Sequence, residues 1–130
     1  MSFDRTKTLE QLKGVTTEEP TFNSSLVKRV HELYRKPLLN FTVEDLRLMV
    51  GQGIELEYLL PLALEKLEAD PFAAGDYYRG DLLMATLKIG HRSWEPHLEL
   101  YTRFCELISG LSGTLLDLHS AIENFLSERA

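Results

Sequence analysis

Hydrophobic residues recur every three or four positions along most of this chain, which is the spacing of one face of an α-helix. The clearest stripe follows Gly113, where Leu115, Leu118, Ile122 and Phe125 repeat with that period. No segment alternates apolar and polar residues over many positions, and the best strand candidate, IELEYL, has only six residues. The pattern predicts an all-α fold, a single compact domain over residues 1–130 with about six or seven helices.

Capping residues, glycines and prolines divide the pattern into helices. Thr8 is an N-cap candidate with Gly14 beyond the helix end, Asn23 or Ser24 can cap the next helix, and Thr42 with Asp45 resembles a capping box. The expected helices cover 8–13, from 23 or 24 to just before 37, 42–51, 54–60, 62–69 (restarted or kinked at Pro61), 81–87 with Asp81 as cap, a long helix beginning near 93–96, and a last one after 113.

Charge is unevenly distributed along the 130 residues. Residues 1–40 carry seven Lys/Arg and five Asp/Glu (+2), residues 41–81 carry three and nine (−6), and residues 82–130 carry four and six (−2), for a net charge of −6. A negative field of this kind repels nucleic acid and anionic membranes and attracts a basic partner. No apolar run reaches the roughly 18 residues that cross a bilayer, and the first residues form no secretory signal. With a single cysteine, these features indicate a soluble cytoplasmic protein without an internal disulfide.

The sequence gives little support to a phosphate-binding loop, a metal site or a catalytic nucleophile. The GQG at 51–53 follows a helical pattern and lacks the GK[ST] of a phosphate loop, so a helix end explains its glycines better. The four histidines, at 31, 91, 97 and 119, lack metal-ligand spacing, so no metal or other cofactor is expected. Cys105 lies on an apolar helix face, and no GxSxG is present, so no nucleophile is assigned.

An acidic and aromatic series remains as the candidate site. Two of its carboxylates with separated pKa values would suit a small hydrolase, but the same series would fit the cationic cleft of a partner. Aromatic residues of the type enriched at interface hot spots lie among them, and Tyr77 and Tyr78 fall in a polar loop. The partner-binding candidates are Glu55, Glu57, Asp70, Asp76, Tyr77, Tyr78 and Asp81.

Three blocks of the sequence resemble a known family. They are RKPLLNFTVEDLRLMVGQG (35–53), LEYLLPLALEKLEADP (56–71) and GDYYRGDLL (75–83), within a longer run over 22–87. This run resembles CdiI, the immunity proteins of bacterial contact-dependent growth inhibition (CDI) systems. The resemblance implies a cytoplasmic binder, not an enzyme, that neutralises the C-terminal toxin domain of a cognate CdiA in a 1:1 heterodimer. Many such toxins are nucleases, often acting on tRNA, with basic clefts that an acidic surface would occlude.

The family does not fix which residues contact the toxin, so the seven candidates rest on the charge and aromatic pattern alone. Direct nucleic-acid or membrane binding is not expected. Two other classes stay open: a carboxylate-based hydrolase, and a helical adaptor for an apolar peptide.

Overall fold

The computed structural model describes residues 2–21 and 24–128, and within them the all-α prediction is confirmed. No strand forms in these residues, although Ala74 and Arg79 make an isolated antiparallel bridge. The chain divides into two compact units, Met1–Ile89 (unit 1) and Gly90–Ala130 (unit 2). The expected single domain over residues 1–130 stays a prediction.

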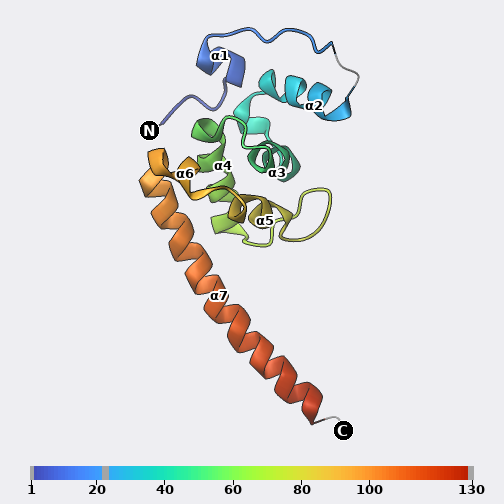
Figure 1. The fold of residues 1–130 in the computed structure, drawn as a ribbon, viewed down its shortest axis with the longest axis vertical. Helices are drawn as coiled ribbons and strands as arrows, with labels where there is room; N and C mark the ends of the chain where they lie inside the picture. Colours follow the sequence, from blue (N-terminus) through green and yellow to red (C-terminus); the bar gives the residue numbers. More distant parts are fainter. Residues whose placement is uncertain (1, 22–23, 129–130) are drawn as a thin grey trace. The chain divides into compact units, whose positions relative to one another are not determined.

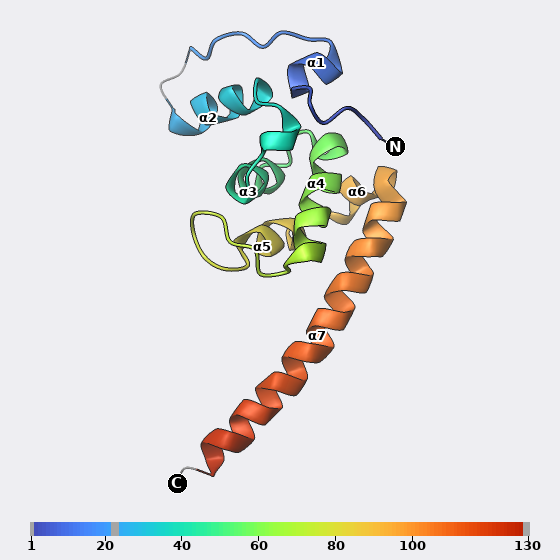
Figure 2. The ribbon, with the colours of Figure 1, turned by 180° about the vertical axis from the view of Figure 1, so that it is seen from behind.

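Unit 1 contains five α-helices and a short 3₁₀ segment in its described part. They are α1 (Leu9–Lys13), α2 (Ser25–Tyr34), η1 (Leu38–Asn40), α3 (Val43–Gly51), α4 (Leu56–Ala69) and α5 (Asp81–Leu87). Helices α3, α4 and α5 pack on one another, and α1 packs on α2 (Figures 1 and 2). The core side chains include Leu46, Met49, Leu59, Leu67 and Leu82, all fully buried.

The predicted helix starts of unit 1 are largely confirmed. Thr8 and Thr42 each form a capping box, with Gln11 and Asp45, and Ser24 caps α2. Asn23, the other cap candidate, lies outside the described residues. Gly53 follows α3 with a φ of 68°, a conformation that favours glycine, so the GQG is a helix end as predicted.

Two of the predicted helix boundaries in unit 1 are wrong. Pro61 lies inside one continuous helix, α4, and does not separate two helices. A proline there removes one backbone hydrogen bond, and burial of leucines on both sides of it, among them Leu60 and Leu62, outweighs that loss. At α5 the cap residue is Gly80, while Asp81 is the first helical residue.

Unit 2 consists of α6 (His91–Trp94), η2 (Glu95–His97) and the 30-residue α7 (Leu98–Ser127). The predicted interruption at Gly113 is absent, because a glycine inside a helix costs only about 1 kcal/mol relative to alanine and does not end it. Trp94 is buried and stacks on Phe104 at 5.2 Å between ring centroids. Cys105, expected to be buried, is half-buried. None of the described helices has the length and apolar character needed to cross a membrane.

Candidate functional site

The segment from Asp70 to Gly80 joins α4 to α5 and is called here the 70–80 loop (Figure 1). It presents four of the predicted contact residues to solvent: Asp70, Asp76, Tyr77 and Tyr78 are exposed, with 71% of Tyr77 and 53% of Tyr78 accessible. Tyrosine is enriched at protein interfaces relative to the rest of the surface and is frequent among the residues that contribute most to binding. The loop is therefore a candidate surface for contact with a partner protein.

The carboxylate of Asp81 anchors the backbone of this loop. Its side chain is buried and accepts hydrogen bonds from the backbone N–H groups of Gly75 (2.7 Å), Tyr77 (3.1 Å) and Tyr78 (3.3 Å). Burial acts to raise the pKa of Asp81, but these backbone donors together lower the pKa below its ordinary value. Asp81 is thus an ionised anchor for the loop, and its carboxylate faces inward.

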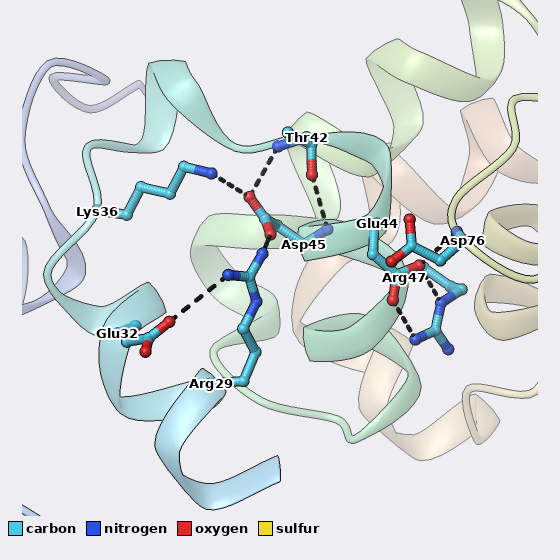
Figure 3. Close-up of polar contacts among 8 residues, drawn as sticks. All are labelled: Arg29, Glu32, Lys36, Thr42, Glu44, Asp45, Arg47 and Asp76. Atoms are coloured by element: carbon cyan, nitrogen blue, oxygen red, sulfur yellow. Dashed lines mark hydrogen bonds and ion pairs between the residues drawn. The ribbon is translucent and has the colours of Figure 1, made fainter. Parts of the chain in front are cut away.

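The carboxylate of Glu44 in α3 also anchors the loop backbone (Figure 3). Its Oε1 accepts from the Asp76 N–H at 2.9 Å, and both its oxygens pair with the guanidinium of Arg47 at 2.6 Å. The Arg47 guanidinium lowers the pKa of Glu44 and lies 4.4 Å from the centre of the Tyr77 ring, within cation–π range. Glu44 and Arg47 of α3 thereby connect this helix to the backbone of Asp76 and the ring of Tyr77 in the loop.

Gly75 lies between the two anchoring carboxylates. A Cβ at this position would be 2.5 Å from Glu44 Oε1, closer than real Cβ atoms approach a neighbour, and a tight 3.0 Å from Asp81 Oδ2. A larger residue would displace the Glu44 carboxylate, so glycine lets the loop backbone reach both carboxylates.

Beside the loop, the surface is hollowed by about 230 Å³ between α3 and α5. Its walls include Arg47, Gly51, Tyr77, Tyr78, Met84 and Lys88. The hollow is smaller than the roughly 300–1,000 Å³ of pockets that enclose small ligands. Its size and its aromatic rim suit the side chains of a protein partner better than a small substrate.

The predicted site residues do not form one cluster. Asp70, Asp76, Tyr77, Tyr78 and Asp81 lie in or next to the loop that follows α4. Glu55 and Glu57 lie at the other end of α4, whose 14 residues span about 20 Å. The two groups would have to contact separate parts of any partner.

Glu55 is occupied by contacts inside unit 1. It accepts from Lys13 Nζ at 2.8 Å and from the Tyr34 hydroxyl at 2.5 Å, and 15% of its side chain is exposed. Burial, and the bond to Glu55, raise the pKa of Tyr34. Glu57, by contrast, is exposed to solvent.

Tertiary structure largely neutralises the charge asymmetry of the sequence. Cations from the first 40 residues pair with carboxylates of the 41–81 segment: Arg5 with Glu65, Lys13 with Glu55, and Arg29 and Lys36 with Asp45 (Figure 3). Much of the −6 segment is thus paired within the molecule. The exposed Asp76 lies outside all of these ion pairs.

Sequence reasoning missed Glu44 and Arg47 as supports of the loop. Their i, i+3 spacing on one helix face was a readable sign that they pair with each other. The contact between Glu44 and Asp76, 32 residues later, had no such sign. Tyr58, another aromatic residue of the acidic 41–81 segment, packs edge-on against Phe3, so it contributes to internal packing.

The described residues contain no group of three or more His, Cys, Asp or Glu side chains placed to hold a metal ion. The sequence profile of the CDI immunity proteins matches residues 10–103. The chain therefore belongs to this family of proteins that protect against CDI toxins, and its partner is a cognate CDI toxin. No curated protein matches the sequence.

Proposed function

We propose that this immunity protein neutralises a toxin nuclease by placing the 70–80 loop over the basic cleft that binds the RNA substrate. The observation that carries the proposal is the pair of exposed tyrosines beside Asp76, on a backbone held by Glu44 and Asp81. The complex is a 1:1 pair of immunity protein and CdiA C-terminal domain, formed in the cytoplasm.

Rigidity of the loop supports this assignment. Four consecutive residues, 75–78, each donate their backbone N–H to a carboxylate of Glu44 or Asp81. A segment already held in its binding conformation loses less conformational entropy when a partner contacts it. The loop can therefore contribute its side chains to binding at little ordering cost.

Charge and aromatic character give the loop its specificity for a basic partner. Asp70 and Asp76 are exposed, and their carboxylates would lie where the toxin holds substrate phosphates. Tyr77 and Tyr78 provide flat faces that a nuclease cleft, built to contact bases, accepts by stacking. In this proposal Asp81 and Glu55 support the fold, and Glu57 is a separate outlying contact.

The hydrolase alternative is disfavoured by the direction of the pKa shifts. A catalytic acid at neutral pH needs a raised pKa so that it holds a proton to donate. Glu44 and Asp81, the two carboxylates that converge on the loop, have lowered pKa values and point at backbone amides. They are ionised hydrogen-bond acceptors rather than acid–base catalysts.

Replacing Asp70 and Asp76 together by asparagine should slow association with the toxin domain about five- to tenfold at low salt. Asparagine preserves the side-chain oxygen of Asp70 that accepts from the Phe72 N–H, while removing both charges that steer a basic partner. The salt dependence of the rate should flatten in the same variant. Stopped-flow mixing at several salt concentrations measures both effects.

The matched control is Glu99→Gln with Glu123→Gln in α7, which removes the same charge from exposed positions outside the loop. Its association rate should stay within about twofold of the wild-type rate, because the two removed charges lie outside the proposed contact surface, although the net charge changes as much as in the loop variant. Equal slowing in the two variants would show that only net charge matters, and would contradict the proposed contact.

A further inference from the structure

The hydrophobic stripe of α7 has the spacing of a coiled coil. Ile108, Leu111, Leu115, Leu118, Ile122 and Phe125 follow one another at intervals of three, four, three, four and three residues. This alternation averages 3.5 residues, the repeat that keeps one seam of a helix facing a second helix. A helix that packs on the surface of a globular core shows a broader apolar face.

The same spacing extends back to Tyr101 and Phe104, and this earlier part of the apolar face is covered within unit 2. Tyr101 and Phe104 contact Trp94 of α6, and Tyr101 also contacts His91 of α6. From Leu115 onward the seam is exposed: Leu118 and Ile122 are each 54% accessible and Phe125 is 70% accessible. This part of α7 also lies beyond residue 103, where the family match ends.

The seam is complementary to itself in an antiparallel arrangement. With the two-fold axis midway between Leu115 and Leu118, Leu115 of one copy meets Leu118 of the other. The same register pairs Leu111 with Ile122 and Ile108 with Phe125. Every position of the seam therefore meets an apolar seam position of the second copy, as an isologous dimer requires.

Charge does not oppose this pairing, although each copy carries a net charge of −6. The positions that flank the seam between residues 111 and 122 are uncharged: Ser112, Thr114, His119 and Ala121, with His119 counted as neutral. These flanking positions are the ones that meet across a coiled coil and set the choice of partner. A basic toxin would be selected by acidic flanks, which the segment lacks, so the second copy is the better occupant.

We propose that residues 108–126 of α7 form an antiparallel homodimer of this immunity protein. The segment is about 27 Å long, and packing two copies along it buries on the order of 1,000 Å², at the lower limit of specific interfaces. An interface of this size suits a weak dimer that dissociates on dilution. It uses residues other than those of the 70–80 loop.

Sedimentation velocity of the wild-type protein from about 1 to 500 μM tests the dimer. The weight-average mass should rise from one chain toward two over this range. Leu118→Glu should raise the dissociation constant at least tenfold, so its weight-average mass should stay well below that of the wild type at every concentration, because it places a charge at the centre of the seam. Leu116→Glu is the matched control, since Leu116 is exposed at 65% on the same helix but off the seam, and it should dimerise like the wild type.

Ile122→Glu provides a second seam variant, and circular dichroism establishes that each variant keeps its helices. A wild-type protein that is monomeric at 500 μM would overturn the proposal. So would dimers that persist in both seam variants, or equal loss of dimer in Leu116→Glu. Toxin binding is measured separately, so loss of the dimer with retained toxin affinity refutes neither proposal.

Discussion

Replacing Asp45 by alanine should lower the free energy of unfolding by about 2 to 3 kcal/mol. Asp45 is fully buried, closes the capping box of α3 with Thr42, and pairs with Lys36 at 2.6 Å and with Arg29. Loss of a cap costs about 1 kcal/mol. Loss of the buried ion-pair partner adds less than in a dry interior, because Arg29 and Lys36 are partly exposed. Urea denaturation at pH 7 measures the difference.

Asp76→Ala is the control for this prediction. Its side chain is exposed, and its backbone N–H, which donates to Glu44 Oε1, is kept by alanine. Its unfolding free energy should stay within about 0.5 kcal/mol of the wild type. An Asp45→Ala protein as stable as Asp76→Ala would contradict the role of Asp45.

The stability supplied by Asp45 should also depend on pH. Burial acts to raise its pKa, but the Lys36 ammonium and the Thr42 N–H lower it below the unfolded value of about 3.9. A carboxyl with a lowered folded pKa stabilises the protein above its unfolded pKa, and this stabilisation is lost as pH falls through the folded pKa. The advantage of the wild type over Asp45→Asn should therefore be constant from pH 7 to 5 and shrink below about pH 4.

Removing both tyrosines of the loop, as Tyr77→Ala with Tyr78→Ala, should weaken binding of the toxin domain about 100-fold. A few aromatic side chains near the centre of an interface commonly supply most of its binding free energy. The effect should appear in the dissociation rate, because neither side chain carries charge that steers association. Calorimetric titration with the toxin domain gives the affinity, and surface plasmon resonance gives the two rates.

Leu39→Ala serves as the control for the tyrosine pair. Leu39 is as exposed as the tyrosines, at 68%, but lies in η1, outside the loop. Its affinity for the toxin domain should match the wild type. If the tyrosine variant also binds like the wild type while remaining folded, the loop tyrosines do not contribute to toxin binding.

Local signals in the sequence were sufficient to predict most helix boundaries of unit 1. Thr8, Thr42 and Gly53 act through hydrogen bonds or backbone conformations that involve only their near neighbours. The predicted helix ends at Pro61 and Gly113 were wrong. Each residue costs a helix some stability locally, but the rest of the helix supplies more stability than that, and the local sequence does not show this. The continuous α4 and α7 are the result.

The candidate site was harder to predict, since its residues meet through long-range contacts. The sequence placed Tyr77 and Tyr78 in an exposed loop, and the structure confirms their exposure. It could not show that Glu55 is occupied by Lys13, 42 residues away, or that Asp81 turns inward to the loop amides. Formal charges counted along the chain therefore overstated the acidic surface, because Arg5 pairs with Glu65 and Lys13 pairs with Glu55 in the folded protein.

The most direct test of the proposed function is amide hydrogen exchange of the wild-type immunity protein, free and bound to its toxin domain. If the 70–80 loop covers the toxin cleft, peptides spanning residues 70–80 should exchange more slowly in the complex, and those of α2 should not change. Slower exchange confined to α2 or to other segments, with residues 70–80 unchanged, would contradict the account.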